Sequence, residues 1–451
     1  MIPTSHSVRS VLALIALLLV QCSDYLWGAV YHHAHPAWVL GVVVLVYALL
    51  FGVLVWLACR LVTPARTLWL LDFLSLQLFF YFVLVTMRRL HMFEGALSLP
   101  LKLALAGASV GAGGWLLWRS DSALRARINS ALIGAAALFA LTPPLVAAVS
   151  AAPSVFPVRA AGMPDAPNVL VILLDELGDQ AAAPVVDALR RQGLQVSRAA
   201  LAPLGENTVN VIPAMLTGKD FGAAQPCSAS AICSGDAILD FSRMRSVEPR
   251  MDIVGFHHPY CAIAGLRSCY QALTPSIENP FVWFGCVLLK ATTRISTAAC
   301  DWRLLTVAQV GAARRELLAA AARAPFWREG GVLFVHVPLP HPPGKRDGAN
   351  LDQDYEANLL DAAALVESLA VRMRQSFGAR HALVISSDHP LRPKVWCAMA
   401  RYAAAGCAVR PAFVDTRIPL LVATPGAAPP GAVARGIFGA VNQLRGASAG
   451  P

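Results

Sequence analysis

The stretch that decides the fold of this chain is Asn168-Val-Leu-Val-Ile-Leu-Leu-Asp-Glu176. Its apolar run is unbroken and has the length of a strand. Such a run is typical of a strand buried on both faces, as in a parallel sheet that is covered by helices. The two acids at its end, Asp175 and Glu176, therefore fall at the carboxyl edge of the predicted sheet, where open α/β folds bind their ligands.

Further strands and helices alternate after this stretch. We predict strands at residues 194–199, 331–337, 381–387 and 417–424, and helices at 181–191, 302–324, 354–374 and 432–444. Strands that alternate with helices indicate an α/β sandwich. We expect this domain to occupy residues 168–445, after an Ala- and Pro-rich linker at residues 151–167.

Polar side chains follow three of the predicted strands. Asp175 and Glu176 end the first, His341 follows the strand at 331–337, and Asp388 and His389 follow the strand at 381–387. The acids alone are equally consistent with caps on the next helix, and His341 alone with a loop residue. Because the carboxyl ends of such strands meet at one edge, we expect the three groups to converge there.

A single hydroxyl lies in the segment Glu206-Asn-Thr-Val-Asn-Val-Ile-Pro-Ala-Met-Leu-Thr-Gly218. The pattern predicts a helix that starts at Asn207-Thr208 and stops at Thr217-Gly218. Thr208 alone reads most simply as a helix cap. The same position also suits a nucleophile that receives a phosphate, because free backbone N–H groups and the positive end of the helix dipole point toward it.

Residues 1–150 are the apolar part of the chain. The chain has 451 residues, of which 56% are hydrophobic and only 14% charged. Five runs, at residues 11–30, 37–62, 67–86, 99–118 and 130–149, are each long enough to cross a bilayer of about 30 Å. We therefore expect a five-helix transmembrane domain at residues 1–150. The net charge of +10 comes without a Lys/Arg block, so we expect no nucleic-acid partner.

Basic residues in the short connections set the orientation of these spans. The second and fourth connections carry Arg60, Arg66, Arg119, Arg125 and Arg127, and the first, at residues 31–36, carries neither Lys nor Arg. We therefore expect a multi-pass protein of the bacterial inner membrane whose residues beyond 150 lie in the periplasm. Arg88 and Arg89, on the outer side, are contrary to the rule.

Few ionisable groups fall in or near the spans. Asp24 and Asp72 lie near helix ends, where we favour an anchoring role over a place on a substrate path. His32, His33 and His35 resemble a metal cluster by their number, but we prefer a short, wet, interfacial loop.

The cysteines fit an oxidising compartment. Eight of the ten lie beyond residue 220 in near neighbours, for which we predict the pairs Cys227/Cys233, Cys261/Cys269, Cys286/Cys300 and Cys397/Cys407. No C-x-x-C motif supports the rival interpretation of a zinc site.

Carboxylates and a histidine that meet at one edge make a site for one divalent cation. Mixed nitrogen and oxygen ligands favour Zn²⁺, with Mn²⁺, Ca²⁺ or Mg²⁺ as alternatives. A threonine hydroxyl beside such a cation can ionise and attack a phosphoryl group. His341 would then protonate the leaving oxygen or bind the phosphate.

The motifs resemble those of the sulfatase-like branch of the alkaline phosphatase superfamily. Three of them, in the family's order, are the stretch from Asn168 to Leu177, Thr208-x-x-x-x-Pro-Ala-Met-Leu-Thr-Gly218, and Ser386-Ser-Asp-His389. The segment around His341 and the late strand at residue 417 are also similar, and the resemblance covers residues 168–426. Together with five preceding spans, it points to the membrane phosphoethanolamine transferases and lipoteichoic acid synthases.

The resemblance implies a role for each matching residue. Metal ligands would be Asp175, Glu176, Thr208, Asp388 and His389; Thr208 would be the nucleophile and His341 a catalytic and substrate-binding residue. Asn207 would help to cradle the phosphate. Family members continue Asp-His with Gly-Glu and a later His, whereas this chain has Pro390 and no later His, so a second metal site is left open. Arg392 or Lys394 would bind phosphate in its place, and an equal alternative is that both are solvated basic residues.

Three functions follow from this resemblance. The first is a metal-dependent transferase, a monomer, that moves a phosphoethanolamine- or phosphoglycerol-type group from a membrane phospholipid to an envelope glycolipid or glycan through a Thr-linked intermediate. The second is a hydrolase of phosphate esters or diesters, and the third a catalytically degenerate domain that binds a glycan or partner. Sulfate-ester hydrolysis is disfavoured because the threonine at 208 cannot become formylglycine.

Overall fold

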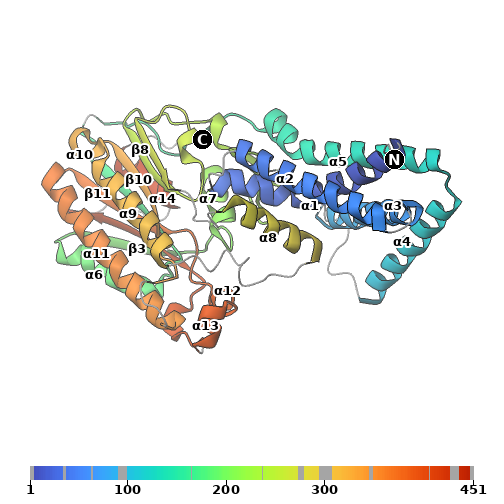
Figure 1. The fold of residues 1–451 in the computed structure, drawn as a ribbon. Helices are drawn as coiled ribbons and strands as arrows, with labels where there is room; N and C mark the ends of the chain where they lie inside the picture. Colours follow the sequence, from blue (N-terminus) through green and yellow to red (C-terminus); the bar gives the residue numbers. More distant parts are fainter. Residues whose placement is uncertain are drawn as a thin grey trace. The chain divides into compact units, whose positions relative to one another are not determined.

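The structure is a computed structural model that describes residues 5–33, 37–61, 64–89, 99–163, 165–235, 237–272, 279–293, 307–344, 349–405, 407–426 and 436–446. The chain forms two compact units. The helical unit comprises Met1–Val30, His35–Val149 and Ile277–Asp301, and the sheet unit comprises Tyr31–Ala34, Ser150–Ser276 and Trp302–Pro451. Both are drawn in Figure 1. The helical unit includes Ile277–Asp301, a segment that the sequence analysis placed in the α/β domain.

The five apolar runs of the N-terminal part lie in helices. These helices are α1 (Ser5–His33), α2 (Ala37–Leu61), α3 (Pro64–Arg89), α4 (Leu99–Arg119) and α5 (Ser122–Ser150). A sixth, α8 (Pro280–Thr293), packs Trp283, Phe284 and Val287 against Leu40 and Val43 of α2. The apolar sequence of α8 therefore serves the helical unit rather than the core under the sheet.

Among the described residues, one helix is long and apolar enough to cross a membrane, namely α5. Apolar stretches of α1 and α2, His6–Val20 and Trp38–Leu54, are shorter. Inside the unit, Asp72 of α3 is buried and accepts hydrogen bonds from Ser10 of α1 (2.6 Å) and Asn129 of α5 (2.7 Å), and its other oxygen lies 3.0 Å from Nε2 of His6. This buried carboxylate ties three helices together.

The sheet unit is built on seven strands in the order β3-β12-β11-β2-β10-β8-β9. Their bounds are β2 (Asn168–Asp175), β3 (Gln195–Leu201), β8 (Met251–Phe256), β9 (Ser268–Ala272), β10 (Val332–Pro340), β11 (His381–Ser387) and β12 (Ile418–Thr424). All neighbours are parallel except β12, which is antiparallel to both β11 and β3. The opening stretch of the sequence, β2, lies between β10 and β11 and is buried along nearly its whole length, as predicted.

Helices cover both faces of this sheet (Figure 1). Leu170, Ile172 and Leu174 of β2 pack with α6 (Ala183–Arg191), α9 (Val307–Arg323), α10 (Phe326–Glu329) and α11 (Leu351–Phe377). The alternate residues Val169, Val171 and Leu173 pack with α7 (Thr208–Thr217) and α14 (Gly436–Leu444). Because successive side chains of a strand point to opposite faces, one unbroken apolar strand serves both cores. The predicted α/β sandwich is confirmed.

The predicted linker differs from the structure. Within residues 151–167, β1 (Ser154–Val155) pairs with β7 (Met244–Arg245), and Phe156 and Val158 are fully buried. A small sheet of β4 (Gln225–Pro226), β5 (Ala231–Ser234) and β6 (Ala237–Asp240) was also not predicted. Phe156 and Val158 thus belong to a core of the sheet unit, which the Ala- and Pro-rich composition of the linker did not indicate.

Three of the four predicted disulfides are present: Cys227–Cys233, Cys261–Cys269 and Cys397–Cys407. Cys286 is also disulfide-bonded, while its predicted partner Cys300 lies outside the described residues. Cys22 of the helical unit is free and buried.

Candidate active site

Thr208 is the first residue of α7, and the residue before it caps the helix. The side chain of Asn207 accepts a hydrogen bond from the backbone N–H of Asn210 at 3.2 Å, and Gly218 ends the helix with a φ of 72°. The predicted helix start and stop are therefore confirmed. Since Asn207 is the cap, the hydroxyl of Thr208 is not used for capping. It donates instead to Oδ2 of Asp388 at 2.8 Å.

Asp388 is held in place by backbone groups. Its Oδ1 accepts from the N–H of His389 at 2.7 Å and from the N–H of Glu176 at 3.2 Å. These contacts join the ends of β11 and β2, and they leave Oδ2 to face Thr208. The carboxylate is fully buried, so its orientation is fixed by the two strand ends.

The neighbouring strands bring a metal-binding geometry together. Asp175 ends β2, Asp388 follows β11, and His336 lies in β10, opposite Leu173 of β2. One ligand atom from each of these three buried residues lies within 4.8 Å of the others. His389 is adjacent, with its Nε2 3.5 Å from Oδ2 of Asp388 and 3.8 Å from Oδ1 of Asp175.

Hydrogen bonds at Nδ1 orient the rings of both histidines. Nδ1 of His389 lies 3.0 Å from the carbonyl of Pro390, so Nδ1 carries the hydrogen and donates it. Nδ1 of His336 lies 3.2 Å from the hydroxyl of Tyr260. Gly255 makes room for that tyrosine, since a Cβ there would meet the Tyr260 ring at 2.1 Å. In His389 the Nε2 lone pair is thus left for the centre of the site, and His336 has the same form when its Nδ1 donates to the Tyr260 hydroxyl.

The donor atoms at this centre fit a divalent cation. Among the described residues, Oδ1 of Asp175, Nε2 of His336 and Nε2 of His389 are buried and have no hydrogen-bond partner. Buried polar atoms are otherwise almost always paired, so three unpaired ones that converge call for a ligand. Two carboxylates and two imidazoles form a mixed set that suits Zn²⁺ or a similar ion.

The structure gives the carboxylate of Glu176 other partners. Both of its oxygens accept from Nε1 of Trp396, at 3.0 and 2.8 Å, and one accepts from Nε of Arg392 at 3.2 Å. The backbone of Glu176 has a φ of 66°, a left-handed conformation that is rare outside glycine and that recurs at functional sites. This turn directs the predicted ligand Glu176 toward α12 (Pro393–Cys397), and it is not among the three grouped ligands.

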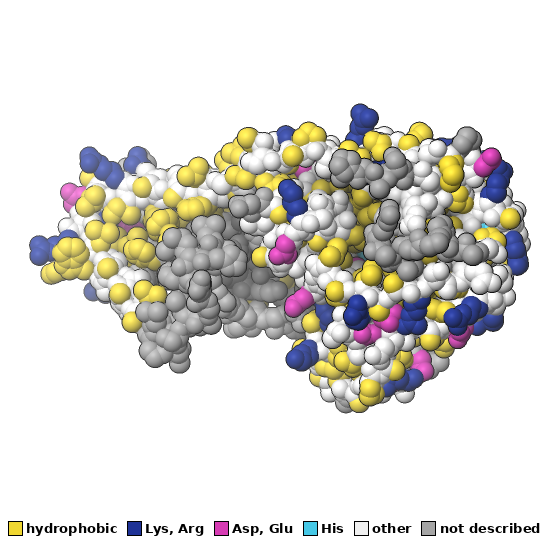
Figure 2. Space-filling view, turned by 180° about the vertical axis from the view of Figure 1, so that it is seen from behind, with side chains coloured by type: hydrophobic (Ala, Val, Ile, Leu, Met, Phe, Trp, Pro, Cys, Tyr) yellow, Lys and Arg dark blue, Asp and Glu magenta, His cyan; other side chains and the backbone are white. Residues whose placement is uncertain are grey.

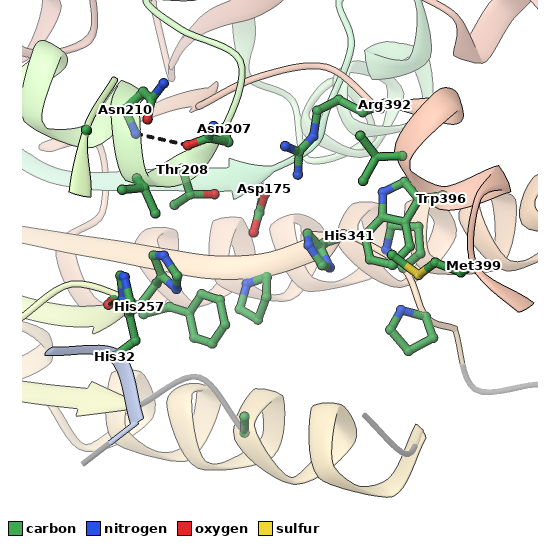
Figure 3. A pocket seen from close by; sticks show the side chains of 18 of the residues that line it. His32, Asp175, Asn207, Thr208, Asn210, His257, His341, Arg392, Trp396 and Met399 are labelled. Carbon is green, nitrogen blue, oxygen red and sulfur yellow. Dashed lines mark hydrogen bonds between the residues drawn. The ribbon is translucent and has the colours of Figure 1, made fainter. Parts of the chain in front are cut away.

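The pocket in front of Thr208 has a volume of 480 Å³. Figure 3 shows Asp175, His341 and Arg392 around its centre, Trp396 and Met399 at one side, and His32 and His257 near Thr208. The predicted residues Asp175, Asn207, Thr208, His341 and Arg392 all line it. Most of the remaining lining is apolar: Val209, Ala224, Pro226, Phe256, Ala313, Pro338, Pro342, Pro343 and Val395. The site thus offers a charged centre within apolar walls.

His341 is fixed by its backbone. Its carbonyl accepts from the buried guanidinium of Arg314 on α9 and from Nδ2 of Asn358 on α11. Its ring packs edge-on against Trp396, with ring centres 4.8 Å apart. Burial lowers the pKa of His341 below the usual value, although Glu176 opposes this shift. His341 is therefore neutral at neutral pH.

The two carboxylates have opposite shifts. Burial raises the pKa of Asp175 well above its usual value, and the negative charges of Asp388 and Glu176 add to this. Burial would also raise the pKa of Asp388, but His389, His336 and the hydrogen bond from Thr208 lower it below its usual value. Two like charges this close disfavour each other, so the raised pKa falls on Asp175 and the lowered one on Asp388.

Sequence reasoning missed two histidines of this site. His336 stands at the middle of the apolar strand β10, on the same face as Phe334, where a lone histidine reads as a core residue. His258 follows β8, a strand that was not predicted, and its Nε2 lies 3.1 Å from the carbonyl of Thr208. The rule that polar groups follow buried strands would have found His258 if β8 had been recognised.

Comparison with known proteins gives matches only among solved structures; no family model and no curated protein matches. Matching structures include Ps i-CgsB in complex with a k-i-k-neocarrahexaose (13% identity, 63% of this chain and 73% of that chain, TM-score 0.37). The integral membrane protein lipooligosaccharide phosphoethanolamine transferase A (EptA) from Neisseria meningitidis matches at 11% identity, with 91% of this chain and 88% of that chain covered and a TM-score of 0.31. A protein of the alkaline phosphatase superfamily from Vibrio parahaemolyticus matches at 12% identity, with 63% and 69% covered and a TM-score of 0.29. All three matches have TM-scores of 0.37 or less and identities of 13% or less.

Proposed function

We propose that this chain is a membrane-anchored, metal-dependent transferase that moves a phosphoethanolamine- or phosphoglycerol-type group from a phospholipid to an envelope glycolipid or glycan. The observation that supports this most is the hydroxyl of Thr208. It starts a helix, opens to the pocket, and is hydrogen-bonded to Asp388 beside three unpaired ligand atoms. A threonine that served only the fold would not need these buried, unpaired neighbours.

Asp175, His336, Asp388 and His389 would hold the cation, with Oγ1 of Thr208 next to it. When bound, a divalent cation supplies positive charge that lowers the pKa of the hydroxyl and offsets the charge of the phosphoryl group. Glu176, which the sequence suggested as a ligand, is assigned a different role: it orients Arg392 and Trp396 in the pocket wall.

The first half of the reaction transfers the group to Thr208. Oγ1 forms a bond to phosphorus and the bond from phosphorus to the donor's glycerol oxygen breaks, so that the threonine proton ends on the departing alcohol. Asp388 Oδ2 already accepts that proton in a hydrogen bond and thereby directs the lone pairs of Oγ1 toward the pocket. The N-terminus of α7 and Arg392 would stabilise the phosphoryl oxygens.

In the second half an acceptor hydroxyl attacks the Thr208-linked phosphorus. His341 is neutral at neutral pH, so it is suited to take the acceptor's proton rather than to supply one. The bond between Oγ1 and phosphorus breaks and Thr208 regains a proton, which restores the starting state. Water in place of the acceptor would give hydrolysis by the same residues.

The apolar surface of the helical unit supports a membrane anchor. Large apolar side chains are exposed on α2, α4 and α5, including Trp38 (72%), Trp118 (75%) and Val149 (82%). In Figure 2 the described part of this unit is mostly hydrophobic, with Lys and Arg gathered at one end. Soluble monomers rarely expose so much contiguous apolar surface. We therefore retain the multi-pass topology, with the sheet unit in the periplasm, as part of the proposal.

The test uses the full-length protein in native membranes, given fluorescent phosphatidylethanolamine or phosphatidylglycerol. Release of fluorescent diacylglycerol together with a mass increase on envelope glycolipids supports the transferase. Release of the free headgroup phosphate without any modified glycolipid supports the hydrolase. Unchanged donor lipid, no adduct on Thr208 and no bound metal would refute both.

A further inference from the structure

Two residues from the end of α1 belong to the sheet unit and lie at its active site. Tyr31 and His32 are grouped with that unit although more than a hundred residues separate them from its remainder. Tyr31 is 1% exposed and packs within the core that contains Ile212 of α7. His32 lines the pocket. His32, which the sequence analysis placed in a wet interfacial loop, is therefore part of the pocket wall.

A chain of two hydrogen bonds leads from Tyr31 to the nucleophile. The hydroxyl of Tyr31 lies 2.9 Å from Nδ1 of His258, and Nε2 of His258 lies 3.1 Å from the backbone carbonyl of Thr208. A carbonyl can only accept, so Nε2 carries the hydrogen and donates it. In the neutral ring Nδ1 is then an acceptor, and Tyr31 must donate to it.

The surroundings of His258 favour this neutral form. The ring is fully buried, with Phe241 stacked on it at 5.7 Å and Tyr31 edge-on at 5.9 Å. Burial lowers the pKa of His258 well below its usual value. The donors of both hydrogen bonds are thus defined: Tyr31 donates to His258, and His258 donates to the carbonyl of Thr208.

His32, the next residue after Tyr31, contacts His257 in the pocket wall. Its Nδ1 lies 3.0 Å from the carbonyl of His257, and the rings of His32 and His257 stack with centres 4.0 Å apart. Figure 3 shows the two rings together on the side of the pocket where Thr208 lies. His257 has a φ of 70°, a left-handed backbone that turns His257 and His258 in different directions after β8. One imidazole therefore faces the pocket while the next reaches Thr208.

We propose that Tyr31 is a positioning residue of the active site, which acts through His258 to hold the backbone of Thr208, and that it does so for the transfer reaction proposed above. Thr208 begins α7, where no preceding helical turn restrains it. An extra donor on its carbonyl fixes the direction in which Oγ1 leaves the backbone, and small misplacements of a nucleophile cost large factors in rate. Tyr31 thus makes the end of α1 part of the proposed active site.

The experiment compares purified full-length variants in detergent with fluorescent phosphatidylethanolamine as the donor. Tyr31→Phe keeps the ring and removes only the hydroxyl; we expect kcat to fall about tenfold, the effect of one hydrogen bond, with little change in KM. His258→Gln keeps a donor near Nε2 and should retain more activity than His258→Leu. Tyr402→Phe is the matched control, because Tyr402 is equally buried and its hydroxyl donates to Asp354 at 2.9 Å.

A double variant separates positioning from folding. If Tyr31 acts only through His258, adding Tyr31→Phe to His258→Leu lowers kcat no further, whereas independent effects multiply. Multiplying effects, or equal losses of kcat in Tyr31→Phe and Tyr402→Phe, would overturn the proposal. Thermal unfolding of each variant shows whether a loss of rate follows a loss of stability.

A second measurement does not depend on the proposed function. Nitrogen-15 spectra of histidine-labelled full-length protein, with the His258 signal assigned from its absence in His258→Gln, report which ring nitrogen carries the hydrogen. We expect the hydrogen on Nε2 and a change at Nδ1 of His258 in Tyr31→Phe. A hydrogen on Nδ1, or no change in that variant, contradicts the relay even if no transfer is found; absent transfer with the expected spectra refutes the function alone.

Discussion

The hydroxyl of Thr208 and Oδ2 of Asp388 lie 2.8 Å apart, although 180 residues separate them along the chain. Asp388 follows β11 and Thr208 starts α7, so the contact depends on the whole sheet being formed. The same carboxylate lies 3.5 Å from Nε2 of His389. One oxygen of Asp388 thus connects the proposed nucleophile with the proposed metal ligands.

Replacement of Thr208 by Ala should abolish transfer while the protein remains folded. The variant loses one hydrogen bond to a carboxylate that keeps two backbone donors, which should cost about 1–2 kcal/mol in the free energy of unfolding. Donor turnover and the melting temperature are to be measured together. Thr217→Ala is the control, because Thr217 ends the same helix and its hydroxyl bonds backbone groups, donating to the carbonyl of Pro213 and accepting from the N–H of Lys219. Full activity in Thr208→Ala would contradict a Thr-linked intermediate.

His336 should be needed to retain the metal. His336→Gln removes a nitrogen that lies near Asp175 and Asp388, so we expect the bound metal to fall well below that of the wild type. Tyr260→Phe removes the partner of its Nδ1 and should weaken metal binding about 10–100-fold, as loss of such an orienting contact does elsewhere. Elemental analysis and metal titration of the purified proteins measure both.

A matched histidine serves as the control for this experiment. His381 is also buried, at the start of β11, and its Nδ1 lies against the carbonyl of Gly378 rather than at the site. His381→Gln should leave the metal content unchanged. Addition of metal at a thousand times its dissociation constant should stabilise the wild type by about 4 kcal/mol; equal stabilisation of His336→Gln would show that His336 is not a ligand.

The pH dependence of transfer should reflect the lowered pKa of His341. Its pKa in the folded protein is below the usual 6.5 because the ring is buried. A neutral ring is required to take the acceptor's proton, so activity should persist as pH falls through 6.5 and decline only when it reaches the lowered pKa. In His341→Gln this acidic limb should disappear from the kcat profile. A limb centred above pH 6.5 in the wild type, or an unchanged limb in the variant, would contradict the role.

The sequence predicted the parts of the fold that have strong patterns. The apolar run of β2 and the acids after it placed the sheet and one corner of the site, because burial on both faces leaves an unmistakable composition. The pattern fails where polar residues enter a strand. Asp252 lies within the buried strand β8, where it accepts a hydrogen bond from Nε of Arg267 at 3.1 Å. Because this charged residue interrupts the apolar pattern, β8 was not predicted, and His258 after it was missed.

The details of the site could not be predicted for a different reason. Adjacent residues in sequence, Asp175 and Glu176, have different partners because the left-handed turn at Glu176 separates them. His336 and Tyr31 reach the site only through packing between segments that are far apart in the chain. Motifs therefore indicated where the candidate site lies, and the three-dimensional contacts show which side chains meet there.

The number of free thiols tests the disulfide pattern. The three defined pairs account for six oxidised cysteines, and Cys286 with its predicted partner Cys300 makes eight, so only Cys22 and Cys59 should react. Titration of the unfolded, unreduced protein should therefore find two thiols. Ten thiols would place the sheet unit in a reducing compartment.

The Cys397–Cys407 bridge should matter for activity as well as for stability. It closes a loop next to Trp396, whose indole N–H holds Glu176 in the pocket wall. Replacing both cysteines by Ser should cost about 3 kcal/mol in the free energy of unfolding, the value expected for a loop of this length. Transfer activity measured below the new melting temperature should also fall, with a rise in KM; an unchanged KM would show that the bridge does not support the pocket wall.

The orientation in the membrane gives the last prediction. Arg119, at the end of α4, lies about 6 Å from the rings of Trp115 and Trp118, which are exposed. Aromatic and basic side chains together are typical of a membrane–water interface, and basic ones of its cytoplasmic side. A tag after residue 451 should therefore be cleaved by protease added to cells with a permeable outer membrane and an intact inner membrane, while a tag before residue 1 stays protected. Protection of the C-terminal tag would place the sheet unit in the cytoplasm, where neither the disulfides nor an envelope acceptor would be expected.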